Sequence, residues 1–122
     1  MVEGELERVL VKLLRDQGPV FVADIELSSA ELTIQTLAGD GQFLCGIVNV
    51  TETSTVKHMI EEAIKTFGKI DVLVNNAGIN GTGEWWERET PNDKSWSRVH
   101  EVNVREVVRV SELIVPHMKK RK

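Results

Sequence analysis

Three short apolar runs stand out along the chain. They cover residues 20–23, 43–48 and, with Asp71 as the one charged residue, 70–74. Each run is short, is bounded by Gly, Pro, Asp or Asn, and is rich in Val, Ile, Leu and Phe, as is typical of strands buried on both faces of a sheet. The pattern therefore predicts three buried strands.

Other stretches carry apolar residues at helical spacing. This spacing predicts helices over residues 5–16, over 53–67 and, in a valine-rich stretch, from about residue 95 to 118. The pattern Ser28-Ser29-Ala30-Glu31 resembles a capping box and predicts a further helix starting near Ser29. Thr53 or Ser54 can cap the next helix, and Gly68 is typical of its C-terminal end.

The predicted order is αβαβαβα, with residues 79–94 as a polar loop. Apolar strands that alternate with amphipathic helices indicate a parallel sheet covered on both faces. We therefore expect an α/β fold with three strands and about four helices in three layers. The length of 122 residues suits a single domain over residues 1–122.

Composition narrows the function classes. With 41% hydrophobic and 28% charged residues, the chain has the composition of a globular protein, and its net charge of −4 gives no reason to expect nucleic-acid binding. No apolar run has the length of a membrane span, and the first residues lack the features of a signal peptide. The single cysteine, Cys45, cannot form an intrachain disulfide, so a cytoplasmic location is the default.

Residues 67–78 carry the most specific motif. Phe67-Gly68-x-x-Asp71, followed by an apolar run and by Asn75-Asn76-Ala77-Gly78, resembles the short-chain dehydrogenase/reductase family. The resemblance extends from about residue 6 to residue 119. Four further segments match the family in the same order: Val22-Ala23-Asp24, Asn49-Val50-Thr51, Val102-Asn103-Val104 and Val115-Pro116-His117-Met118.

The resemblance implies a Rossmann-type domain and NAD(P)-dependent hydride transfer between an alcohol and a ketone. The cofactor-binding residues that it implies lie at the carboxyl ends of strands, where such folds bind ligands: Asp24, Asn49, Val50, Asn76, Ala77 and Gly78. A carboxylate after the second strand of the family accepts the ribose hydroxyls of NAD and repels the extra phosphate of NADP. No Lys or Arg follows Asp24 closely, so NAD is favoured over NADP.

Two parts of the family pattern are missing. The Gly-rich turn that cradles the pyrophosphate has no match, and neither does the Ser/Tyr/Lys set that transfers the proton; the chain contains no tyrosine. Only Asn103 remains of the catalytic residues that the resemblance implies, in a supporting role. We therefore expect a partial Rossmann domain, truncated at both ends and inactive alone.

Two alternatives stay open. The chain could be a non-catalytic interaction module that forms a homo-oligomer, or pairs with a full-length relative, through the helix of about 95–118. It could also be a gene fragment without an independent role. We expect no metal site, because His58, His100 and His117 share no ligand spacing, and Cys45 is expected to be an inert buried thiol. Trp85 and Trp86 lie in the predicted loop.

Overall fold

The computed structural model describes residues 9, 11, 14–37, 41–80 and 93–121. Its elements follow one another in the order β1 (Val20–Asp24), α2 (Leu27–Leu37), β2 (Phe43–Ile47), α3 (Thr53–Phe67), α4 (Asp93–His100) and α5 (Glu106–Lys119). A short 3-10 helix, Arg15–Gln17, precedes β1, and a π-helical turn, Glu101–Arg105, joins α4 to α5. The helix expected over residues 5–16 falls largely outside the described residues.

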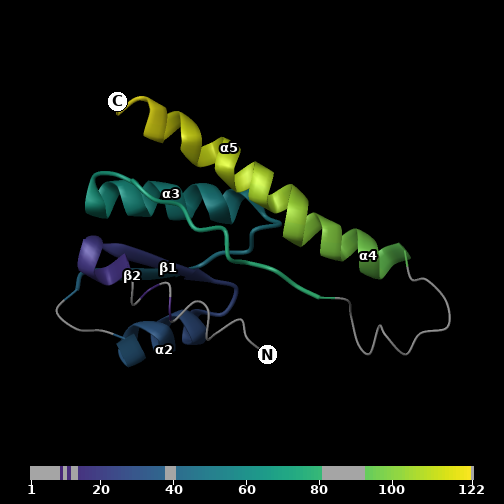
Figure 1. Ribbon diagram of the computed structural model, residues 1–122, viewed down its shortest axis with the longest axis horizontal. Helices are drawn as coiled ribbons and strands as arrows, with labels where there is room; N and C mark the ends of the chain where they lie inside the picture. Colours follow the sequence, from purple (N-terminus) through teal and green to yellow (C-terminus); the bar gives the residue numbers. More distant parts are fainter. Residues whose placement is uncertain (1–8, 10, 12–13, 38–40, 81–92, 122) are drawn as a thin grey trace.

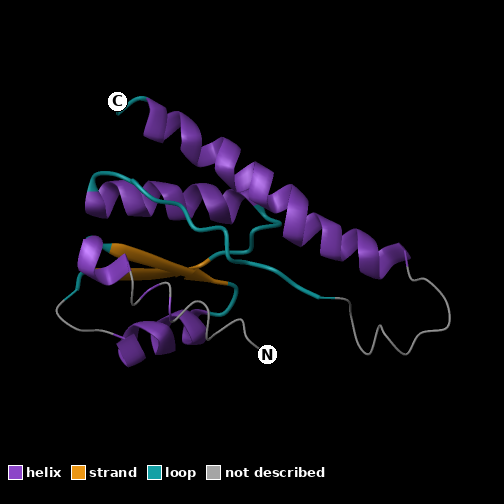
Figure 2. Ribbon diagram, viewed as in Figure 1, coloured by secondary structure: helices purple, strands orange, loops and turns teal. Residues whose placement is uncertain are grey.

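The two strands form a parallel sheet. Val20 lies opposite Phe43, and Asp24 lies opposite Ile47. Helix α2 covers one face of the sheet, and α3 with α5 above it covers the other, so the expected three-layer α/β arrangement is confirmed (Figures 1 and 2). Two runs predicted as strands, residues 20–23 and 43–48, therefore form the sheet. Val20 and Val22 are buried, whereas Ala23 and Ile47 are exposed, so the expected burial on both faces is only partly met.

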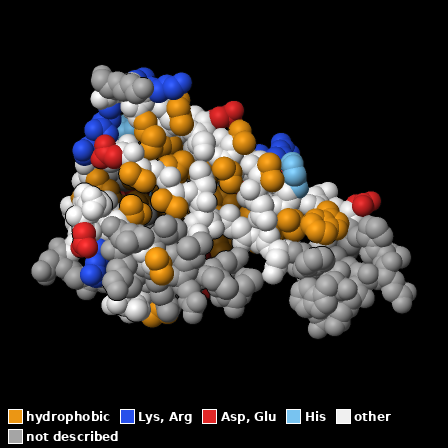
Figure 3. Space-filling view, viewed as in Figure 1, with side chains coloured by type: hydrophobic (Ala, Val, Ile, Leu, Met, Phe, Trp, Pro, Cys, Tyr) orange, Lys and Arg blue, Asp and Glu red, His pale blue; other side chains and the backbone are white. Residues whose placement is uncertain are grey.

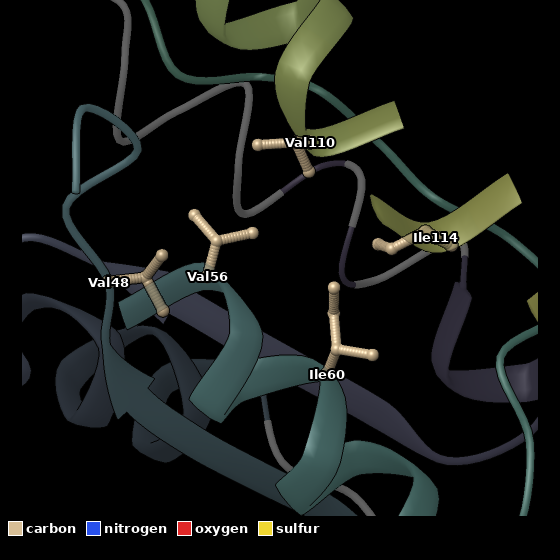
Figure 4. Packing of buried hydrophobic residues seen from close by; sticks show 5 residues of the cluster. All are labelled: Val48, Val56, Ile60, Val110 and Ile114. Carbon is tan, nitrogen blue, oxygen red and sulfur yellow. The ribbon is translucent and has the colours of Figure 1, made fainter. Parts of the chain in front are cut away.

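The core divides between the two faces. On the α2 side, the buried cluster consists of Val11, Val20, Val22 and Ala30. On the α3 side, Val48, the residue after β2, meets Val56 and Ile60 of α3 and Val110 and Ile114 of α5 (Figure 4). These side chains point into the space between the two helices, which fixes α5 above the sheet.

The third predicted strand, residues 70–74, is wrong. The segment is a loop that makes no strand pairing with any described residue. Instead, side chains of α5 hold it: His117 Nε2 accepts the Ile70 N–H at 3.3 Å, and Ser111 Oγ accepts from Asn75 Nδ2 at 3.3 Å. Without a neighbouring strand, its backbone has no ladder to join.

The helix boundaries differ from the expected ones at three places. Helix α2 begins at Leu27 rather than near Ser29, and the N–H groups of Ser29 and Ala30 donate to Glu26 O, so the capping box does not form. Glu52, not Thr53 or Ser54, is the N-cap of α3. The long helix starts at Asp93, two residues earlier than expected, and contains the π-helical turn.

Gly68 ends α3 as expected. Its φ of +80° is left-handed, and its N–H donates to Ile64 O at 2.8 Å. A glycine adopts this conformation without the steric cost that a Cβ brings. The chain can therefore reverse and run back as residues 69–80 (Figure 1).

Candidate functional site

Polar residues gather where the two strands end. The Val48 N–H donates to Asp24 O at 2.8 Å, which continues the ladder to the last residue of β1 and places Asn49 just beyond. Because the strands are parallel, Asp24 and Asn49 lie at the same edge of the sheet. This edge is the usual ligand-binding edge of open α/β sheets.

Asp24 is half-buried and presents one free carboxylate oxygen. Oδ1 accepts the Glu26 N–H at 2.9 Å, immediately before α2 begins. The other oxygen has no hydrogen-bond partner among the described residues. The hydrogen bond to Glu26 holds the side chain in place, so the free oxygen can accept a ligand hydroxyl without an ordering cost for the side chain.

Asn49 is oriented by its own loop. Its Oδ1 accepts the Thr51 hydroxyl at 2.7 Å and the Thr51 N–H at 3.1 Å, and its Nδ2 donates to Glu52 Oε1 at 3.0 Å. The amide oxygen therefore already has two donors, and the second Nδ2 hydrogen is the group left for a ligand. The next residue, Val50, packs its side chain against the α3–α5 cluster.

Thr55 links this strand end to α3. Its hydroxyl oxygen accepts the Asn49 N–H at 3.1 Å and lies 2.8 Å from Asn49 O and 2.9 Å from Glu52 O, to which it can donate. Sequence reasoning had assigned capping to Thr53 or Ser54. The bonds of Thr55 replace that cap and fix the position of the Asn49 backbone.

Asn103 holds the second group of expected site residues. Its Nδ2 donates to Ile79 O at 2.7 Å, and its Oδ1 accepts the Ile79 N–H at 2.8 Å. Asn103 lies in the π-helical turn, a feature that is frequent at functional sites. The side chain of Asn103 therefore fixes the backbone just after Asn76, Ala77 and Gly78.

Gly78 lies beside Asn103, and the space around its Cα would accommodate a Cβ. A Cβ at Gly78 would meet Asn103 Oδ1 at 3.5 Å, an ordinary van der Waals contact. Packing against the described residues therefore does not require a glycine there. Asn76 is half-buried and Ala77 is exposed. None of the hydrogen bonds of Asp24, Asn49, Asn75 or Asn103 joins this group to the one at the strand ends.

Asn75, the first residue of the Asn75-Asn76-Ala77-Gly78 motif, bonds to α5. Its Nδ2 donates to Ser111 Oγ, and Ser111 in turn donates to Val107 O at 2.6 Å. This interaction ties the loop after α3 to a helix.

Glu106 is a buried carboxylate that sequence reasoning missed. It is 1% exposed, and Arg109 Nη1 donates to its Oε1 at 2.6 Å, while Oε2 has no partner among the described residues. Burial raises the pKa of Glu106, and the Arg109 charge opposes that shift. A sequence signal existed: Glu106 lies four residues before Val110 and eight before Ile114, on the apolar stripe of the helix.

Other candidate chemistry is weak within the described part of the chain. No group of three metal-ligating side chains occurs there, and no described helix is long and apolar enough to cross a membrane. Burial, followed by the charge of Glu31, raises the pKa of the Cys45 thiol, which disfavours the reactive thiolate. Trp85 and Trp86 lie outside the described residues.

The amino-acid sequence matches a dehydrogenase family and individual reductases. A family model described as short chain dehydrogenase matches residues 7–122. The 3-oxoacyl-(acyl-carrier-protein) reductase of Thermotoga maritima is 30% identical over 90% of this chain and 44% of its own length. The 5-keto-D-gluconate 5-reductase of Escherichia coli K12 is 35% identical over 84% of this chain and 40% of its own length.

Solved structures give the same fold. An alcohol dehydrogenase from Thermococcus sibiricus, complexed with 5-hydroxy-NADP, aligns with 93% of this chain at a TM-score of 0.77 and 20% identity. LigO from Sphingobium sp. strain SYK-6 aligns with 97% of it at 0.80 and 22% identity. The aligned parts are 48% and 43% of those chains, so this chain spans less than half the length of these relatives.

Proposed function

Because the chain belongs to the short-chain dehydrogenase family, we propose that it contributes NAD-binding residues to an oxidoreductase that transfers a hydride between an alcohol and a ketone. The cofactor would supply the nicotinamide that takes up or releases the hydride. The residues of this chain would bind and orient it. A cytoplasmic location is part of the proposal, since the single Cys45 cannot form an intrachain disulfide.

The free oxygen of Asp24 carries the proposal. Asp24 lies at the same carboxyl edge of the sheet as Asn49, and the other oxygen of its carboxylate is already fixed by the Glu26 N–H. An ordered carboxylate with a free oxygen suits the hydroxyls of a ribose. The remaining Nδ2 hydrogen of Asn49 suits a ring nitrogen of adenine, and the Val50 backbone would lie against the same base.

Asn76, Ala77 and Gly78 would lie along the other half of the cofactor. Asn103 fixes the backbone at Ile79 and thereby positions these residues. Since the described residues leave room for a Cβ at Gly78, the close approach of a ligand is a better reason for the glycine than these neighbours are. Asn103 is thus a positioning residue in this proposal.

NAD is favoured over NADP by charge. The carboxylate of Asp24 would repel the extra phosphate of NADP, and Glu26 adds a second negative charge nearby. The first basic residue after Asp24 is Lys57, which lies within α3 and is exposed. No cation close to Asp24 in the sequence would neutralise the phosphate.

We further propose that these 122 residues bind cofactor without completing the reaction. The family transfers its proton through a tyrosine, and the chain has none. Asn103 cannot replace it, because an amide does not titrate in the relevant pH range and both of its polar atoms are bonded to Ile79.

Calorimetric titration of the full chain with NADH and NADPH tests the proposal. We expect NADH to bind more tightly than NADPH. Asp24→Ala should weaken NADH binding by about tenfold, the equivalent of roughly 1.4 kcal/mol. Glu26→Gln is the matched control, because it removes a neighbouring carboxylate that makes no proposed ribose contact. Absence of heat with either cofactor at millimolar concentration would overturn cofactor binding.

A second candidate function is self-association through the long helix. Val104, Val108 and Val115 of the π-helical turn and α5 are 49%, 53% and 37% exposed, and Figure 3 shows hydrophobic side chains at the surface along α4 and α5. We propose that this valine face pairs with a second copy or with a full-length relative. Light scattering should show a dimer that Val108→Lys dissociates and that Lys57→Gln, on the exposed surface of α3, does not. A monodisperse monomer that co-purifies with no relative would exclude this function.

A further inference from the structure

The π-helical turn between α4 and α5 is closed by Glu101 and Glu106. The Glu106 N–H donates to Glu101 O, five residues back, whereas an α-helix would use the carbonyl four residues back. In a regular α-helix, side chains five residues apart point about 140° away from each other around the axis. The wider π-helical turn brings them toward the same side of the helix, so it places the carboxylates of Glu101 and Glu106 near each other.

The guanidinium group of Arg109 bridges these two carboxylates. Its Nη1 donates to Glu106 Oε1 at 2.6 Å, and its Nη2 donates to Glu101 Oε1 at 3.3 Å. Because the donors of a guanidinium group have a fixed relative geometry, one arginine side chain sets the distance between the two acids. Arg105 Nη1 also donates to Glu101 Oε2 at 2.9 Å, but among the described residues it forms an ion pair with this carboxylate alone.

Arg109 offsets the repulsion between the two acids. Burial raises the pKa of Glu106, the charge of Arg109 lowers it, and the Glu101 carboxyl raises it through a hydrogen bond and its own charge. The three groups therefore interact with one another. Since the π-helical turn is what places the two acids together, a cation that binds both of them favours this turn over a regular α-helix.

Asn103 lies inside the same turn. Its side chain is exposed, so packing does little to orient it, and the backbone of the turn decides where its amide points. That amide makes both bonds to Ile79, at 2.7 and 2.8 Å. If the turn relaxed to a regular α-helix, Asn103 would rotate about the helix axis relative to α5, and its amide would no longer meet both Ile79 groups.

We propose that Arg109 and Glu106 are positioning residues, which hold the π-helical turn and, through Asn103, the backbone at Ile79. They act on residues 76–78 from a distance and touch neither the cofactor nor the reacting atoms. The consequence for the cofactor rests on the proposed function, in which residues 76–78 lie along one half of it. The bridge itself is a property of this chain and can be tested without a cofactor.

Amide hydrogen exchange on the full chain tests the proposal at Ile79. Glu106→Leu removes the acceptor of Arg109 and fills the buried position with an apolar side chain of similar volume, so this variant should fold. We expect its Ile79 amide to exchange about tenfold faster than in the parent chain. The Gly68 amide, which donates to Ile64 O, should change by less than about twofold, because it does not depend on the turn.

Glu106→Gln is the matched conservative variant. Its amide oxygen can still accept from Arg109, so it should keep the parent exchange rate at Ile79. Unchanged exchange at Ile79 in Glu106→Leu would overturn the proposal. So would an equal rise in both Glu106 variants, or a rise at Ile79 and Gly68 alike, since the cluster would then stabilise the fold without orienting Asn103.

Arginine variants test the bridge from its other side. In the Glu106→Leu background, Arg109→Met should not speed exchange at Ile79 further, because the bridge is already absent and no buried charge loses its partner. In the parent chain, Arg105→Met removes an arginine that binds Glu101 but does not bridge, and it should change Ile79 exchange by less than about threefold. An effect of Arg105→Met as large as that of Glu106→Leu would contradict the bridge.

Titration with NADH separates this proposal from the proposed function. If the parent chain binds NADH, Glu106→Leu should weaken binding by about threefold or more, and Glu106→Gln should restore it. Equal affinity of the parent chain and Glu106→Leu would overturn the extension to the cofactor. If the parent chain does not bind NADH, the proposed function fails, while the exchange rates at Ile79 still decide the role of Arg109 and Glu106.

Discussion

The side-chain amide of Asn103 and the backbone of Ile79 are bonded in both directions, at 2.7 and 2.8 Å. An asparagine side chain thus supplies to Ile79 the donor and the acceptor that a neighbouring strand would normally supply. The two residues are 24 positions apart in the sequence, and the π-helical turn places the amide where it can reach. This pair fixes the end of the loop segment after α3.

Removing the Asn103 amide should therefore loosen that segment. Asn103→Ala leaves the half-buried Ile79 without partners for its N–H and C=O, and we expect a loss of about 1–2 kcal/mol in the free energy of unfolding. Urea unfolding measures it. Ser97→Ala, at an exposed helical position, is the control. An unchanged urea midpoint for Asn103→Ala would show that the pair contributes nothing to stability.

Glu106 should make stability fall as the pH rises. Its pKa is raised in the folded state by burial, so the folded chain binds this proton more tightly than the unfolded chain does. The free energy of unfolding then decreases as the pH rises from the ordinary carboxyl pKa through the raised one. Above that window, both states are ionised and the destabilisation is complete.

The neutral isostere Glu106→Gln removes this effect. At pH 7, we expect it to be more stable than the parent chain, because the raised pKa of Glu106 means that folding disfavours its charged form, and Arg109 keeps its bond to Glu101. At a pH below the ordinary carboxyl pKa, the difference should disappear. Chemical denaturation at several pH values measures both. A variant that is less stable than the parent at pH 7 would mean that the bond to Arg109 outweighs burial.

Gly68 should tolerate asparagine better than alanine. The φ of +80° is strained for any residue with a Cβ, although no atom lies within 4 Å of the position that a Cβ would occupy. We expect Gly68→Ala to cost about 1 kcal/mol and Gly68→Asn to cost less, because asparagine adopts the left-handed region more easily. Thermal unfolding compares the two. Equal melting temperatures for all three chains would contradict the assigned conformation.

Thr55 should matter more than Thr53. Thr55→Val keeps the shape but removes the hydroxyl that bonds to the Asn49 backbone, and we expect it to cost about 1 kcal/mol. Thr53→Ala changes a residue that makes none of these bonds and should cost less. Denaturant midpoints measure both variants. A larger cost at Thr53 would restore the cap predicted from the sequence.

The fold could be predicted as far as local patterns reach. The runs that form β1 and β2 were recognised because a continuous apolar run of this length is typical of a strand, and Gly68 was recognised because a left-handed helix end favours glycine. Residues 70–74 are also mostly apolar, but a strand forms only when a neighbouring strand pairs with it. The sequence of a segment does not show whether such a neighbour is present. Their observed state depends on His117 and Ser111, which are distant in the sequence.

The candidate site, too, could be predicted only where it depends on local sequence features. The motifs located Asp24, Asn49 and residues 76–78, because strand ends and short polar sequences are local features. They did not show that Thr51 occupies the oxygen of Asn49, or that Asn103 bonds to Ile79. These bonds depend on the paths of the loop and of the π-helical turn. Glu106 was missed because its burial results from the packing of α5 onto the core.

Cofactor binding at the carboxyl edge is tested most directly by NMR titration of the isotope-labelled chain with NAD. We expect concentration-dependent amide shifts at Asp24, Glu26, Asn49, Val50 and residues 76–78, and none at Lys57 and Glu61 on the exposed side of α3. Asp24→Ala should abolish the shifts at the strand ends at the same cofactor concentration. Shifts confined to other surfaces, or no shifts at millimolar NAD, would contradict a dinucleotide site in this chain.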